Sequence, residues 1–99
     1  MNDDQELVCL QKDYWQMLYA LLSNQAMLES YSYLRRNIKV TMTPPGRDSD
    51  EIFVIFPSGT HVFTFGHQGV KYLGLSNEEK FIPFGKFPEL YEIIRQIFQ

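Results

Sequence analysis

The sequence predicts an α+β fold in which helices at the two ends of the chain flank an antiparallel meander of four to five strands. Residues 4 to 36 contain neither glycine nor proline, and their apolar side chains recur at helical spacing. Residues 37 to 84 instead form short runs rich in β-branched and aromatic residues, separated by turns that contain Gly or Pro. Because these turns are too short for a parallel crossover, we expect neighbouring strands to be antiparallel. Residues 87 to 98 return to helical spacing.

The length and composition of the chain predict one globular domain that covers residues 1–99. With 99 residues, 44% of them hydrophobic and 15% aromatic, the chain can bury a modest core. Its one cysteine, Cys9, excludes an internal disulfide and is expected to be a small buried side chain. The N-terminus is acidic rather than basic, and no apolar run approaches about 18 residues, so we expect neither a signal peptide nor a membrane span. These features favour a cytoplasmic protein.

The first helix is predicted over residues 4–22, and residues 25–36 are also compatible with a helix. The apolar side chains of the first segment lie on one helical face: Leu7, Leu10, Tyr14, Met17, Leu18, Leu21 and Leu22. Asn24 is of a residue type that caps helices, so the chain forms either one long helix or two helices that meet near 23–24. One helix over the whole segment would span roughly 48 Å. That length exceeds the width expected of so small a domain, which favours a bend or a protruding end.

Four strands are predicted, with a fifth at the edge of the sheet. They are residues 37–43, 51–56, 60–65 and 70–75, and the shorter edge strand is residues 81–84. Pro83 cannot donate a ladder hydrogen bond, which restricts the last of these strands to an edge. The segment EIFVIF is apolar on both faces, a pattern typical of a central strand that is covered on both sides. The final helix, residues 87–98, is favoured by Pro88 and Glu89 in its first turn.

The apolar side chains exceed what one sheet face can bury. Phe53 and Ile55 lie across the same strand from Ile52 and Val54, and both predicted helices carry apolar stripes of their own. Two explanations remain open: the helices cover opposite faces of the sheet, or one face of the sheet pairs with another molecule. Exposed apolar patches beyond a few hundred Å² usually mark interfaces.

No catalytic, cofactor or metal site is predicted. His61 and His67 are the only histidines, and a metal site needs at least one further ligand that no nearby residue supplies. His61 shares its strand face with Phe63 and Phe65, so we expect it to be partly buried and hydrogen-bonded. The serines lie outside any strand–Ser–helix elbow, and the glycines stand in turns that no helix follows, which argues against acyl transfer and against a phosphate cradle. We therefore expect that the protein is not an enzyme.

The charge of the chain argues against direct nucleic-acid binding. The formal net charge is −3, and the basic patch of Arg35, Arg36 and Lys39 is too small for the usual number of phosphate contacts. We expect the acidic residues to form one rim that docks on a basic protein or imitates nucleic-acid charge. The acids concerned lie in three segments: Asp3, Asp4 and Glu6; Asp48, Asp50 and Glu51; and Glu78 and Glu79.

These observations predict a small non-catalytic module that binds another protein, as an adaptor, a chaperone-like partner or an inhibitor. Self-association as a homodimer, through the N-terminal helix or the sheet, is part of this prediction. Aromatic and arginine side chains dominate interface hot spots, and the acids belong to the predicted rim. The candidate contact residues are Trp15, Tyr19, Tyr31, Tyr33, Arg35, Arg36, Arg47, Asp48, Asp50 and Glu51.

Two alternatives from other functional classes stay open. One is an acidic inhibitor of a nucleic-acid enzyme, of the type made by viruses or mobile elements, which would use the acidic rim. The other is a small ligand-binding or enzyme domain with a pocket between sheet and helix near His61 and Tyr72. The first predicts binding that weakens steeply with salt. The second predicts a concave and partly polar cavity.

Overall fold

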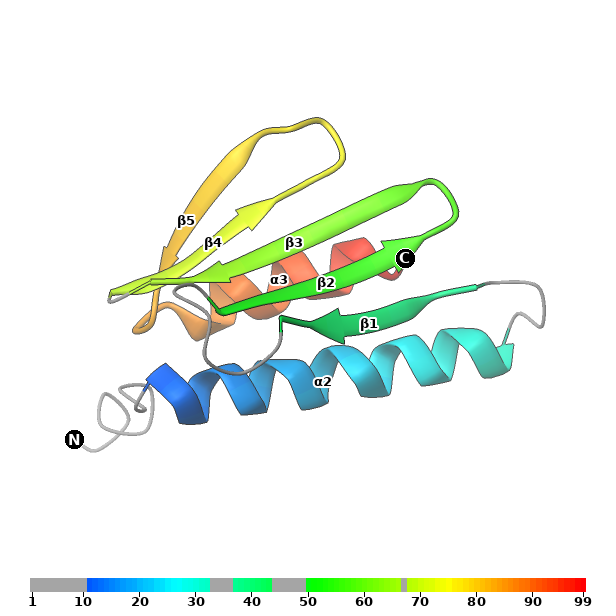
Figure 1. Cartoon of the computed structure of the whole chain (residues 1–99), viewed down its shortest axis with the longest axis horizontal. Helices are drawn as coiled ribbons and strands as arrows, with labels where there is room; N and C mark the ends of the chain where they lie inside the picture. The colour runs from blue at the N-terminus through cyan, green and yellow to red at the C-terminus, as the bar shows by residue number, and fades with distance from the viewer. Residues whose placement is uncertain (1–10, 33–36, 44–49, 67) are drawn as a thin grey trace.

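The computed structural model describes residues 11–32, 37–43, 50–66 and 68–99. A helix precedes a run of strands and a second helix follows it, so the predicted α+β fold is confirmed (Figure 1). The elements in chain order are α2 (Gln11–Ser32), β1 (Lys39–Met42), β2 (Asp50–Phe56), β3 (Gly59–Phe65), β4 (Gly69–Leu73), β5 (Glu79–Pro83) and α3 (Phe87–Ile97).

The helix α2 runs without a break through Ser23 and Asn24, so the structure selects one helix over two. Its 22 residues span about 33 Å and lie along the long axis of the molecule (Figure 1). A helix of this length fits the domain without a bend. Its buried side chains follow one another at four-residue intervals: Tyr14, Leu18, Leu22 and Ala26. The parts of the predicted helix before residue 11 and after residue 32 lie outside the described residues.

The five strands form one antiparallel sheet in the order β1-β2-β3-β4-β5, which is the meander that the short turns predict. The segment predicted as an edge strand is β5, and Pro83 is its last residue, paired with Gly69. Strand β5 begins at Glu79, two residues earlier than predicted. The turn at Pro57 and Ser58 joins β2 to β3.

Both helices lie on the same face of the sheet (Figure 1). One hydrophobic core contains side chains from α2, from α3 and from one side of the strands. The strand residues on this inner face include Val40, Ile52, Val54, Phe56, His61, Phe63, Phe65, Val70, Tyr72 and Ile82. The prediction that residues 51–56 form a central strand is confirmed, whereas no described helix supplies the predicted cover on its second face. Strand β2 is central in the sheet, but the described helices cover only one of its faces.

The C-terminal helix closes the core at the end of the chain. Pro88 stands in its first turn, and Leu90, Ile93 and Ile94 are buried against the sheet. Phe98, directly after the helix, packs on Phe56 with ring centroids 5.6 Å apart. Among the described residues, no helix has the length and apolar character needed to span a membrane.

Candidate functional site

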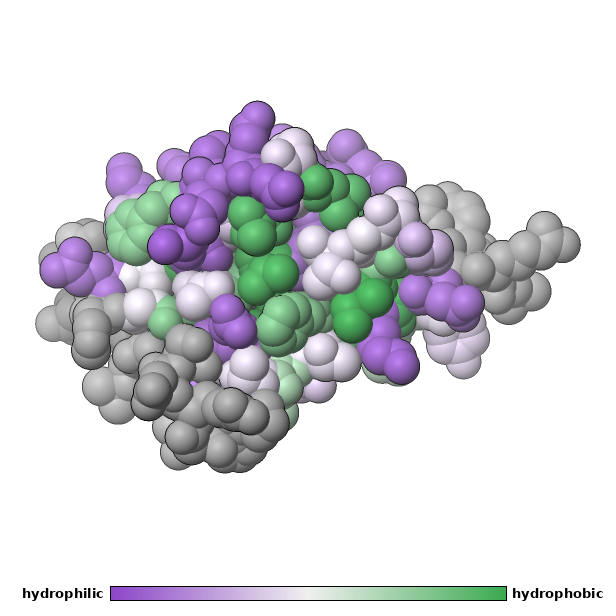
Figure 2. Space-filling model, turned by 45° about the horizontal axis from the view of Figure 1, so that its top comes forward, coloured by the Kyte–Doolittle hydropathy of each residue, from purple (hydrophilic) through white to green (hydrophobic). Residues whose placement is uncertain are grey.

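The outer face of the sheet carries an apolar patch that no described helix covers. We define the open face as the strand side chains that point away from α2 and α3, and its apolar patch as Phe53, Ile55, Val62, Leu73 and Phe81. Four of these side chains are half-buried by their neighbours within the sheet, and Phe81 is 52% exposed. Figure 2 shows apolar side chains gathered at the centre of this face, with hydrophilic ones around them.

The strand register arranges the open face in rows that cross the sheet. The middle row is Thr41, Phe53, Val62, Leu73 and Glu79. The next row is Glu51, Thr64, Lys71 and Phe81. On the other side of the middle row lie Lys39, Ile55 and Thr60. Three apolar side chains therefore stand side by side on the three central strands. Apart from Ile55 next to Phe53 on β2, the side chains that border them on these strands are polar or charged.

The open face carries charge of both signs. Lys39 and Lys71 are exposed, and Glu51 and Glu79 supply two carboxylates, so the four formal charges cancel. The Thr64 hydroxyl donates a hydrogen bond of 3.3 Å to the Glu51 carboxylate. This bond joins the Glu51 carboxylate to the neighbouring strand β3.

The inner face holds a paired histidine and tyrosine. The Nδ1 atom of His61 lies 2.8 Å from the hydroxyl oxygen of Tyr72, and the two rings are stacked at 10° to each other. His61 is only 9% exposed, which confirms the prediction of a buried, hydrogen-bonded histidine. Burial lowers the pKa of the His61 imidazole and raises the pKa of the Tyr72 phenol, because it disfavours the charged form of each. His67 lies outside the described residues.

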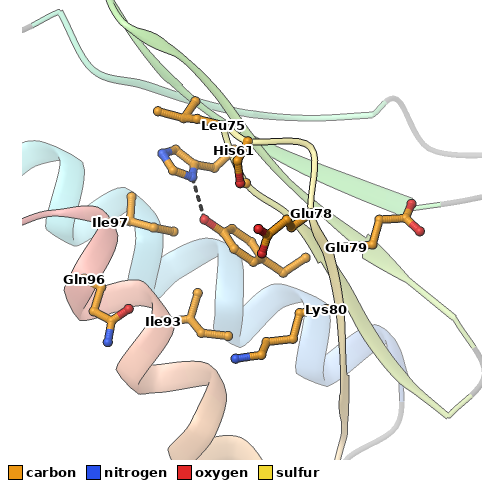
Figure 3. Close-up of a pocket in the computed structure, with 11 residues that line it drawn as sticks. His61, Leu75, Glu78, Glu79, Lys80, Ile93, Gln96 and Ile97 are labelled. Atoms are coloured by element: carbon orange, nitrogen blue, oxygen red, sulfur yellow. Dashed lines mark hydrogen bonds between the residues drawn. The ribbon is translucent and has the colours of Figure 1, made fainter.

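A hollow of about 480 Å³ lies beside this pair, between the sheet, the β4–β5 hairpin and α3 (Figure 3). Its apolar walls come from Leu75, Ile93 and Ile97. Lys80 and Gln96 supply polar groups from the two sides. The hollow therefore lies where the ligand-binding alternative predicts a pocket, and its walls are partly polar, as that alternative also predicts.

The aromatic candidates of α2 fall into two groups. Trp15 and Tyr19 stack on each other with ring centroids 6.3 Å apart, and both are half-buried against the core. Only part of each of these two side chains is therefore accessible to a partner. Tyr31 is 81% exposed, beside the exposed Met27 and Leu28. Among the remaining candidates, those outside the described residues are Tyr33, Arg35, Arg36, Arg47 and Asp48.

The predicted acidic rim is not assembled by the described residues. Asp50 and Glu51 begin β2 and pair with Phe65 and Thr64 at the end of β3. Glu78 lies in the hairpin that joins β4 to β5, which is at the opposite end of the sheet (Figure 1). The prediction that these two acidic segments meet is therefore wrong. The N-terminal acids lie outside the described residues.

Sequence reasoning missed Val62, Leu73 and Phe81 as candidates for binding. The sequence points to this surface through Phe53 and Ile55, because the segment EIFVIF is apolar on both faces. In the described part of the chain, no group of three or more His, Cys, Asp or Glu side chains is placed to hold a metal ion.

Comparisons with protein-family models, curated proteins and solved structures find no significant match to this chain.

Proposed function

We propose that this protein is a non-catalytic protein-interaction module that binds its partner through the open face of the sheet. The observation that carries the proposal is the row of Phe53, Val62 and Leu73 on three adjacent central strands, without a helix over it among the described residues. Removing such a row from water is favourable in proportion to its area. An apolar centre with a polar border is also the usual anatomy of a protein interface.

The open face suits binding better than the exposed side chains of α2. The three strands that carry Phe53, Val62 and Leu73 are each hydrogen-bonded to a neighbour on both sides, so their backbone is already fixed before a partner arrives. Preformed surfaces lose less conformational entropy on binding. Met27, Leu28 and Tyr31 instead extend from one end of a helix.

The proposal is tested by affinity capture from native lysate after nuclease treatment, with three baits compared by mass spectrometry. The first bait is the wild-type protein and the second carries Val62→Lys at the centre of the open face. The third carries Leu28→Lys on α2, where the wild-type side chain is 60% exposed. We expect a protein that is retained by the first and third baits and lost by the second. Retention of the same protein by all three baits would contradict the proposal.

The hollow at His61 supports a second candidate function, the binding of a small ligand. Its volume lies within the range of small-molecule pockets, and both apolar walls and hydrogen-bonding groups line it. The test is a thermal-shift screen of small molecules against the wild-type protein and against His61→Ala. A ligand that stabilises only the wild type would support this function, because ligand binding raises the stability of the folded state. A screen in which every stabilising compound acts equally on both proteins would count against it.

A further inference from the structure

We propose that the open face binds a second copy of this chain, with the two-fold axis of the dimer parallel to β3 and midway between the two sheets. The inference rests on the proposed function, because it names the partner of the same surface. Strand β3 is the middle strand of the sheet, with β2 and β1 on one side and β4 and β5 on the other. A two-fold rotation about this axis therefore places the β1–β2 half of one open face over the β4–β5 half of the other.

The apolar row of the open face is complementary to itself under this rotation. Sheets that pack face to face lie about 10 Å apart and keep their strands within about 30° of each other. With the axis parallel to β3, strand β2 of one protomer lies over β4 of the other. Phe53 then lies over the partner's Leu73, and Val62 lies over the partner's Val62. Each apolar side chain of the middle row thus meets another.

The charges of the next row are complementary in the same arrangement. Glu51 stands on β2 and Lys71 stands on β4, in one row on either side of Thr64. The rotation places Glu51 opposite the partner's Lys71, and the symmetry of the dimer makes this pair twice. A rotation about an axis across the strands would instead place Glu51 over the partner's Ile55. The charge pattern therefore selects the axis parallel to β3.

The size of the open face sets the strength of this dimer. Five strands about 4.8 Å apart, each with some three outward side chains, cover roughly 400 Å² per protomer. A stable interface buries about 800 Å² per partner. We therefore expect a reversible dimer with a dissociation constant weaker than about 1 µM. The fraction of protein in the dimer therefore rises with protein concentration.

Charge inversion at the paired positions tests the inference. Glu51→Lys places two like-charged pairs in the homodimer, and Lys71→Glu does the same with the opposite sign. Mixing the two variants restores both attractive pairs in the mixed dimer. The matched control is Lys39→Glu, because Lys39 lies on the same face outside these two rows. The measurement is sedimentation velocity of each protein and of the equimolar mixture, up to near-millimolar concentration, after circular dichroism has confirmed that each variant is folded.

We expect the wild type, the Lys39→Glu control and the equimolar mixture to sediment as dimers at concentrations where each inverted variant is a monomer. A wild type that stays monomeric overturns the inference, and so do inverted variants that dimerise as well as the wild type. These results are separable from a failure of the proposed function. If the wild type is monomeric but Val62→Lys still loses a captured protein, the open face binds a different partner and only the second-copy inference fails.

Discussion

Glu51 and Lys71 lie in the same cross-strand row of the open face, one strand to either side of Thr64. They are opposite in charge and equally distant from the central strand, so a two-fold rotation about an axis parallel to β3 places the acid of one copy over the base of the other. Beside them, Phe53 and Leu73 have the same relation to Val62. The open face is therefore complementary to itself in both its apolar and its charged rows.

Phenylalanines on the two faces of the sheet should differ in their contribution to stability. Phe63 is fully buried between the sheet and the helices, so Phe63→Ala should lower the free energy of unfolding by about 3–5 kcal/mol. Phe53 is half-buried on the open face, so Phe53→Ala should cost about 1 kcal/mol. Urea denaturation of the two variants at low protein concentration measures both losses. Equal losses would mean that the outer face is covered as well as the inner one.

The approach of β5 to Gly69 should make this position intolerant of a side chain. A Cβ atom at Gly69 would lie 2.7 Å from Cζ of Phe81 and 2.8 Å from Cα of Pro83, and would also meet the carbonyl oxygen of Ile82. Gly69→Ala should therefore destabilise the protein by about 1–3 kcal/mol. The control is Gly85→Ala, because nothing lies within 4 Å of a Cβ atom there. Thermal denaturation compares them, and a Gly69→Ala variant as stable as the control would show that β5 does not pair closely with β4.

Removal of the Tyr72 hydroxyl should weaken the fold by about 1 kcal/mol, the usual net value of one hydrogen bond. In Tyr72→Phe the ring remains, but the Nδ1 atom of His61 loses the partner that lies 2.8 Å away. Tyr91→Phe serves as the control, because Tyr91 is 40% exposed on α3 and its hydroxyl can reach water. Chemical denaturation of both variants measures the difference. If Tyr72→Phe and Tyr91→Phe had the same effect, the hydrogen bond between His61 and Tyr72 would not contribute to stability.

The stability of the protein should fall as the pH drops below about 6.5, the pKa of an unperturbed histidine. Burial lowers the pKa of His61 in the folded state, so the unfolded chain takes up a proton that the folded chain resists. The loss continues until the pH passes below the lowered pKa of the folded state. The measurement is the free energy of unfolding at about pH 7.5 and about pH 5, for the wild type and for His61→Gln.

The variant should lose less stability over this range than the wild type. Both proteins keep His67 and the same carboxylates, so the difference between them reports on His61 alone. An equal loss in both proteins would show that the imidazole of His61 titrates freely in the folded state.

The sequence predicted the elements of the fold because each depends on a local pattern. Alternation of side chains with a period of two residues predicted the strands, and Pro83 predicted that β5 lies at an edge of the sheet. The apolar stripe that includes Leu90 and Ile94 predicted the last helix. The face that the helices cover is not a local property. Phe53 and Val54 are adjacent and both apolar, and only the packing of α2 and α3 decides which of them is buried.

The surroundings of the candidate site residues depend on packing that no local pattern determines. Trp15 and Tyr19 are predicted contact residues, and in the structure they are half-buried against the core and stack on each other. The acidic rim failed because successive turns of a meander alternate between the two ends of the sheet. The loop before Asp50 and the hairpin at Glu78 are separated by three strands, which places them at opposite ends.

Methyl NMR over a range of protein concentrations can show whether the open face is the interface between two copies of the chain. We expect the methyl signals of Ile55, Val62 and Leu73 to shift together as the concentration rises, while those of Leu28 on α2 stay constant. Shifts at Leu28 with constant signals on the open face would rule out this interface, and so would spectra that do not change from low micromolar to near-millimolar concentration.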